Sequence, residues 1–168
     1  MSGTGCGDTA FPTLTGSGGH TSGQSRGGRG GAAVRVEAAD IDIYGPITMN
    51  GNSGTYTCGC GWQQHSYGGG GGAGGSILLQ ATGTYQGSGA LTANGGHGSA
   101  CHCQYWGSGG TWGGGGGGGR IAVHAGTIST IGSRSVRGGW SSTGSLNAAW
   151  DGAPGTIYMK STNAGAST

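Results

Sequence analysis

The sequence predicts an all-β fold: a glycine-rich β-solenoid, or β-helix-like stack, of about three and a half repeats, with polyglycine segments packed against the strands. Three observations predict it. Glycine supplies 47 of the 168 residues. Apolar residues alternate with other residues in several segments, which is the pattern of a strand with one buried face. These segments recur at successive offsets of 43, 44 and 36 residues, and such an internal period indicates stacked units.

Composition narrows the classes of function. The chain carries five Trp and six Tyr, and only 7% of its residues are charged, whereas disordered chains combine few aromatic residues with high net charge. Its formal net charge of +2 is too small to favour a nucleic-acid partner. No apolar run approaches the roughly 20 residues of a membrane-spanning helix, and the first residues lack the apolar segment of a signal peptide. We therefore expect a packed protein with no nucleic-acid partner and no membrane span.

The first strand of each unit predicts columns of equivalent side chains. Units stacked at the strand spacing of about 4.8 Å would place two columns inward and one outward. The inward columns are Val34, Ile77, Ile121 and Ile157, and then Val36, Leu79, Val123 and Met159. The outward column is Glu37, Gln80, His124 and Lys160.

Two shorter strands follow each first strand. The second lies around Ile41 and Ile43, Thr84 and Tyr85, and Thr127 and Ile128. The third covers residues 47–49, 90–93 and 135–137. Two of the third strands end in Asn-Gly, a strong turn signal. The sequence therefore predicts strand–turn–strand units, each of which stacks on the previous unit.

A glycine tract recurs before each first strand, at residues 27–31, 69–75 and 113–119. One interpretation is a flexible linker. We favour close packing of the main chain, because polyglycine adopts an extended helix with three residues per turn, like polyproline II. Without Cβ atoms such segments approach a neighbour closely. A linker would not be expected to recur in register with strands.

Four motifs carry a resemblance to known proteins: GGSILLQ at 74–80, GSGALTANGG at 87–96, GGGGGGGRIAV at 113–123 and GAPGTIYMK at 152–160. In these motifs the chain resembles glycine-rich β-solenoid repeats of large secreted or cell-surface, adhesin-like proteins. Its glycine runs also resemble those of phage tail-fibre adhesins. The resemblance implies an extended β architecture at a surface and supplies no catalytic residues.

The same motifs suggest a domain organisation. A glycine- and serine-rich lead-in occupies 1–26 and a tail occupies 161–168. The repeat domain spans 27–160, with units at 27–68, 69–112 and 113–152 and a partial unit at 153–160.

Two Cys-x-Cys pairs lie 43 residues apart and consist of Cys58, Cys60, Cys101 and Cys103. Stacking would bring the corresponding cysteines of the two pairs together. We favour two disulfides, each worth about 2–4 kcal/mol, formed in an oxidising compartment. A zinc site that includes His65 or His102 and free buried thiols are the alternatives. Cys6 is left over by this pairing, which suggests a bond between chains or a free thiol.

Aromatic residues gather in the loops of the units, at Trp62, Tyr67, Tyr105, Trp106, Trp112, Trp140 and Trp150. One interpretation is that these rings cover glycine backbone and close the stack. The other is a contact platform for a receptor or a glycan, because Tyr and Trp are enriched in binding hot spots.

Catalytic residues are scarce. Asp40 and Asp42 flank Ile41 on one strand face, a pair that could serve polysaccharide cleavage or a calcium site, but we favour a solvated outer face. We expect no enzyme and no cofactor, with zinc or calcium as the alternatives.

The function that these observations favour is a structural, surface-exposed or extracellular subunit that assembles with itself, for instance in a filament or sheath. The alternatives are an adhesin that binds a receptor or glycan through the aromatic loops, and a Cys/His metal-binding module.

Overall fold

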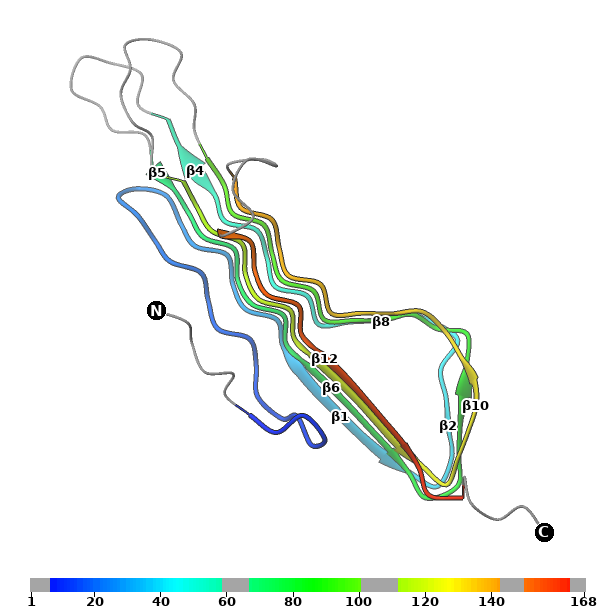
Figure 1. The fold of residues 1–168 in the computed structure, drawn as a ribbon. Coiled ribbons are helices and arrows are strands. Elements are labelled where there is room, and N and C mark those ends of the chain that lie inside the picture. Colours follow the sequence, from blue (N-terminus) through cyan, green and yellow to red (C-terminus); the bar gives the residue numbers. More distant parts are fainter. Residues whose placement is uncertain (1–6, 59–66, 101–111, 143–149, 164–168) are drawn as a thin grey trace.

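The computed structural model describes residues 7–58, 67–100, 112–142 and 150–163. Within these ranges the chain is all β. Figure 1 shows the strands of three parallel sheets at one end of the molecule and a pair of short strands toward the other end. Glycine-rich segments join the two ends, so each unit runs along the molecule and back again.

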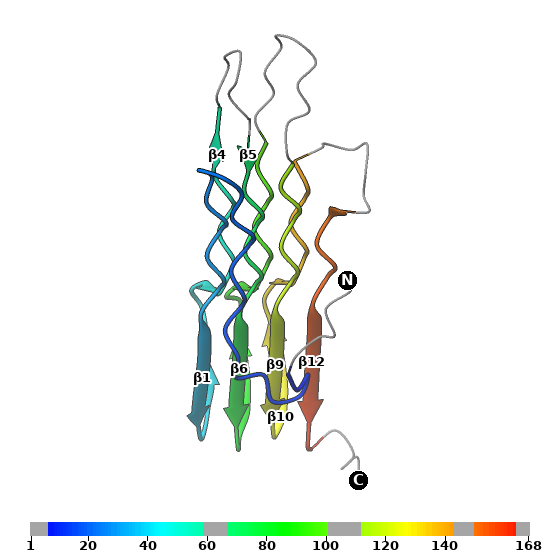
Figure 2. The same cartoon turned by 90° about the vertical axis from the view of Figure 1, so that its left-hand side faces the viewer.

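The first sheet contains the long first strands of the four units. They are β1 (Ala33–Ala38), β6 (Ser76–Ala81), β9 (Arg120–Ala125) and β12 (Thr156–Ser161). All neighbours in this sheet are parallel, in the order β1-β6-β9-β12, as Figure 2 shows. The predicted columns are confirmed, since Val34 pairs with Ile77, Ile77 with Ile121 and Ile121 with Ile157.

Two further parallel sheets contain the shorter strands. The order β10-β7-β2 joins β2 (Ile41–Asp42), β7 (Thr84–Gly87) and β10 (Thr127–Ile131). The order β11-β8-β3 joins β3 (Ile47–Thr48), β8 (Leu91–Thr92) and β11 (Arg134–Ser135). A separate antiparallel pair consists of β4 (Tyr56–Thr57) and β5 (Tyr67–Gly68). The predicted second and third strands are thus present in all three complete units.

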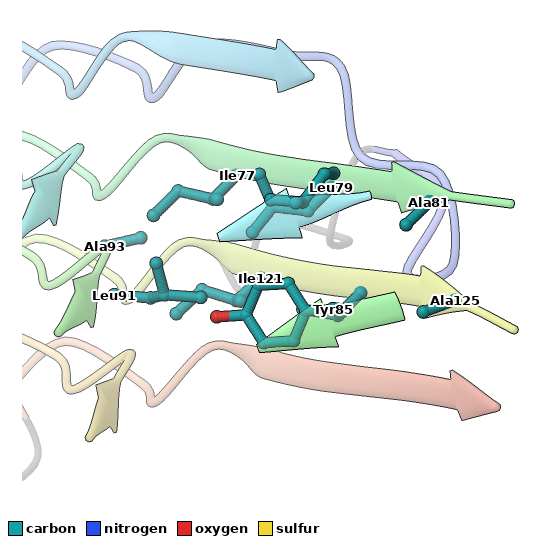
Figure 3. Close-up of a cluster of buried hydrophobic side chains, with 10 residues drawn as sticks. Ile77, Leu79, Ala81, Tyr85, Leu91, Ala93, Ile121 and Ala125 are labelled. Atoms are coloured by element: carbon teal, nitrogen blue, oxygen red, sulfur yellow. The ribbon is translucent and has the colours of Figure 1, made fainter. Parts of the chain in front are cut away.

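The hydrophobic core lies among the three parallel sheets (Figure 3). The first sheet contributes side chains at every second residue, as the alternating pattern predicts. The core residues with 0–1% exposure include Ile77, Leu79, Tyr85, Leu91, Ile121 and Val123. Ile41 from the first unit is 5% exposed.

The glycine tracts are held by hydrogen bonds to other glycine-rich segments. All seven amides from Gly69 to Gly75 donate to a carbonyl outside their own tract. The partners repeat with a period of three: Gly69, Gly72 and Gly75 donate to residues 55, 52 and 49, whereas Gly70 and Ala73 donate to residues 20 and 17, and Gly71 and Gly74 to residues 114 and 117. This is the period of a polyproline II-like helix, which offers its amides in three directions.

The expected packing of polyglycine against strands is therefore corrected. Each tract continues end to end into its own strand (Figure 2). The amides of the tract at 69–75 donate sideways to the tract at 113–119 and to the segments at 17–20 and 49–55, and not to a strand. Such close approach requires glycine: a Cβ at Gly116 would overlap the carbonyl oxygen of Gly72. Where the neighbouring segment comes closest it has a glycine as well, since a Cβ at Gly51 would also overlap the Gly72 carbonyl oxygen.

The lead-in segment folds back onto the repeats. Gly16 and Gly19 donate hydrogen bonds to the carbonyls of Gly31 and Gly28, both at 2.8 Å. Earlier in the segment, Pro12 is fully buried, and the Ser76 hydroxyl donates to the Leu14 carbonyl at 2.6 Å. In Figure 2 this segment, in blue, crosses the outer face of the first sheet.

The lead-in segment buries part of the outer face of the first sheet. Leu78 and Ala122 point away from the core, yet their exposure is 1% and 0%. His124, from the predicted outward column, stacks on Phe11 with ring centroids 4.6 Å apart, and its Nε2 lies 2.5 Å from the Ala10 carbonyl oxygen. The middle of the outer face is therefore partly buried, which the column pattern alone did not predict.

Candidate functional site

The first candidate site is the pair of open edges of the first sheet. Among the described residues this sheet ends at β1 on one side and at β12 on the other. The inner column is buried in the middle and exposed toward its ends: Ile77 and Ile121 are 0% exposed, Ile157 is 43% exposed, and Val34 is partly buried. An edge strand presents unpaired N–H and C=O groups that another strand can bond. Both edges therefore combine backbone hydrogen-bonding groups with unburied apolar surface.

Charged residues mark the same two edges. On β1, the Arg35 guanidinium pairs with the Glu37 carboxylate, and each side chain is 55% exposed. On β12, Lys160 is exposed. Tyr158 is half-buried, and its ring centroid lies 5.3 Å from that of His124. On the same face of the sheet, the β1 edge thus carries one arginine and one glutamate, and the β12 edge carries one lysine.

The second candidate site is a group of exposed aromatic residues beside the loops. Trp140 is 70% exposed, Trp150 is 50% exposed and Trp112 is 38% exposed. Their backbones belong to adjoining segments, because Gly115 donates to the Trp150 carbonyl at 2.9 Å and Ser142 donates to the Gly113 carbonyl at 3.1 Å. Exposed indole rings of this kind are available for contact with a partner.

Sequence reasoning missed His97 as a member of this group. The Trp140 amide donates to His97 Nδ1 at 2.8 Å, and the two rings lie 5.3 Å apart at 43°. The signal was present, because His97 and Trp140 are separated by the repeat offset of 43 residues.

Tyr67 has a structural role. Gly23 adopts a positive φ of 55°, and a Cβ at this residue would lie 2.5 Å from the Tyr67 ring. The ring therefore covers the turn of the lead-in segment, which agrees with the interpretation that aromatic rings cover glycine backbone.

Several predicted site residues lie outside the described residues. These are Cys6, Cys60, Trp62, His65, Cys101, His102, Cys103, Tyr105 and Trp106. Cys58, which follows β4, is the predicted cysteine that lies within the described ranges. The pairing of the two Cys-x-Cys motifs, the zinc alternative and the role of Cys6 stay predictions.

The carboxylate pair around Ile41 has a local explanation. The Asp40 carboxylate accepts a hydrogen bond from the Thr84 amide at 2.6 Å, so it holds two neighbouring units in register. Asp42 is exposed on β2, while Ile41 points into the core. Within residues 7–58, 67–100, 112–142 and 150–163, no three His, Cys, Asp or Glu side chains are grouped so that they could hold a metal ion.

Tyr85 is the buried titratable group of the core. Its ring is 1% exposed, and its hydroxyl has no hydrogen-bond partner among the described residues. Burial raises the pKa of this phenol above its ordinary value of 10.0, and the nearby Arg134 charge partly opposes that rise. The group is therefore neutral in the folded protein at ordinary pH and acts as a core side chain.

Comparison with protein-family models, with curated proteins and with solved structures finds no match to this chain. No helix in the described part of the chain has the length and apolar character that a membrane crossing requires.

Proposed function

We propose that the chain is a glycine-rich β-solenoid segment and serves as a structural, surface-exposed or extracellular subunit that assembles with itself. The observation that carries this proposal is the first sheet with two open edges, at β1 and β12, where the apolar columns become exposed. Natural proteins usually protect such edges with short strands, charges or covering loops. Here the edge strands carry charged residues but are not short, since both are six residues long, the full length of the strands in the middle.

The two edges differ from one another, which determines the kind of assembly. Pairing of β12 with β1 of another copy is a head-to-tail contact, and such a contact generates an open filament when its rotation does not close a ring. Each added copy would bury the half-exposed Ile157 and Met159 at the join. Burial of apolar area stabilises by roughly 25 cal/mol per Å².

A surface or extracellular location agrees with the cysteine content. Disulfides between the Cys-x-Cys pairs would require an oxidising environment. They would stabilise a chain in which large apolar side chains are few and 47 glycines lose backbone entropy on folding.

Self-assembly is tested by sedimentation velocity over a range of concentrations, combined with negative-stain microscopy. We expect concentration-dependent oligomers for the parent chain. Ile157→Lys, which places a charge at the exposed end of the apolar column, should reduce them. Ser88→Lys, at an exposed turn residue, should leave them unchanged. A chain that stays monomeric at millimolar concentration contradicts the proposal.

A second candidate function is recognition of a receptor or glycan, and it is supported by the exposure of Trp112, Trp140 and Trp150. A glycan array with the parent and with Trp140→Ala tests it: a specific signal that the substitution removes supports recognition, whereas no signal from the parent argues against it. For the metal-binding alternative, elemental analysis after dialysis is the corresponding measurement.

A further inference from the structure

The chain has one glutamate and one lysine, and both lie in the same outward column of the first sheet. Glu37 is on β1 and Lys160 is on β12. They are connected through register pairs, since Glu37 pairs with Gln80, Gln80 with His124, and His124 with Lys160. The two residues therefore stand at opposite ends of the column, about 14 Å apart, which is three strand spacings. Within one chain they are too distant to form an ion pair.

We propose that a second copy of this chain occupies the β12 edge, with its β1 strand parallel to β12 and in the register that the sheet already uses. This inference rests on the proposed self-assembly and specifies the contact between two copies, which is called the joint below. In that register Lys160 stands beside Glu37 of the next copy. Ile157 and Met159 stand beside Val34 and Val36 of the next copy, so both apolar columns continue through the joint.

The charges select this register over its neighbours. A slip of one residue would turn every side chain to the wrong face of the sheet. A slip of two residues in one direction would place Lys160 beside Arg35 of the next copy, where like charges repel. A slip of two in the other direction would place Lys160 beside an alanine, Ala39. The repeated register is the one that pairs opposite charges, and it also places Tyr158 beside Arg35, a favourable cation–π partner.

The joint is expected to be weak. Among the described residues the fourth unit contributes a strand to the first sheet alone, because the other two parallel sheets end at β10 and β11 on this side. The contact therefore involves one pair of six-residue strands and the glycine segment before β12, and it resembles a small, transient interface. The Glu37–Lys160 pair is exposed, so it determines register more than affinity, and salt weakens its effect.

Zero-length carbodiimide cross-linking tests the register, because the single lysine makes the products simple to map. A mixture of isotope-labelled and unlabelled chains is treated with carbodiimide, and peptides are identified by mass spectrometry. We expect an interchain amide between Lys160 and Glu37, and its loss in Glu37→Gln and in Lys160→Gln. Sedimentation at low salt should show self-association weakened by roughly three- to tenfold in Lys160→Glu. Lys160→Arg, the matched control, should retain it.

The outcomes separate this inference from the proposed function. Absence of oligomers at every concentration overturns both. Oligomers in which Lys160 is cross-linked to another carboxylate, such as Asp42, overturn the register and leave self-assembly standing. The same conclusion follows if Lys160→Glu associates as well as the parent, as it would in a two-fold dimer formed through the β1 edges alone.

Discussion

Ile77 and Ile121 are direct partners on neighbouring parallel strands, although 44 residues separate them, and neither side chain is exposed to solvent. The step from Ile77 to Ile121 is the step from one layer of the fold to the next. The same step of 44 residues connects Thr48 with Thr92, Asn50 with Asn94 and Thr55 with Ser99, which are hydrogen-bonded through side chains or backbone groups. Residues one repeat offset apart are thus neighbours in space, both in the strands and in the glycine-rich segments.

The first prediction concerns the position of a residue along the inner column. Ile121→Ala should lower the free energy of unfolding by about 2–5 kcal/mol, because it leaves a cavity in a fully buried site. Ile157→Ala should cost about half of that or less, since this side chain is 43% exposed and its surroundings are open. Chemical denaturation followed by circular dichroism at low protein concentration measures both values. Equal costs would contradict the described column.

The second prediction compares two adjacent glycines. Gly116→Ala should destabilise the fold by about 2 kcal/mol or more, because the added methyl group would overlap the backbone of Gly72. Gly117→Ala should change stability by less than about 1 kcal/mol, since the nearest atom to its Cβ, the Ala153 carbonyl oxygen, is 3.8 Å away. Thermal denaturation of the two variants checks this. A linker role for the tract would make both substitutions equally harmless.

The third prediction concerns the unpaired hydroxyl of Tyr85. Tyr85→Phe should raise the free energy of unfolding by about 1 kcal/mol, because it removes a buried polar group that has no partner among the residues that the structure describes. Tyr56→Phe, at a residue 61% exposed, serves as the control and should leave stability unchanged. Urea denaturation at pH 7 measures both variants, and a clear loss of stability in Tyr85→Phe would show that the hydroxyl is bonded.

The same residue predicts a dependence on alkaline pH. The pKa of Tyr85 is higher in the folded chain than its ordinary value of 10.0, so the folded state holds its proton more tightly than the unfolded state. Its contribution to stability is therefore complete below about pH 10 and is lost as pH rises toward and through the folded pKa. Denaturation midpoints measured between pH 8 and 12 should fall more steeply for the parent than for Tyr85→Phe. Parallel curves would show that Tyr85 does not contribute.

The fourth prediction concerns the cysteines. Peptide mapping by mass spectrometry under non-reducing conditions should find Cys58 bonded to Cys101 and Cys60 bonded to Cys103, because the stack brings residues 43 or 44 apart into neighbouring layers. Reduction should lower the melting temperature, since each bond is worth about 2–4 kcal/mol. Four intact thiols in chain purified from an oxidising compartment would exclude the disulfides and direct attention to a metal.

Much of the β architecture could be predicted from the sequence, because strand alternation is a local pattern and the repeat offset relates the strands of successive units. The pairing of Val36 with Leu79 and of Leu79 with Val123 follows from that offset alone. The burial of Pro12 and the stacking of Phe11 on His124 could not be predicted, because the lead-in segment has no repeat register that relates it to the first sheet.

The hydrogen-bond partners of the glycine tracts could not be predicted from the sequence either. A run of identical residues contains no side chains that indicate which neighbour each amide meets, so the sequence does not distinguish packing on strands from packing on other extended segments. The three directions of hydrogen bonding at residues 69–75 become evident only when all the surrounding segments are placed. In the second candidate site, His97 was missed because the repeat offset was applied to the strands and not to the segments that follow them, where it connects His97 with Trp140.

The central claim is that the glycine tracts are ordered by backbone hydrogen bonds in a stack of equivalent units. Residue-resolved hydrogen exchange of the amides from Gly69 to Gly75 tests it most directly. We expect all seven to exchange slowly, with protection similar to that of the buried strand β6, because each donates to a neighbouring segment. Exchange at the rate of an unstructured glycine linker would contradict the account.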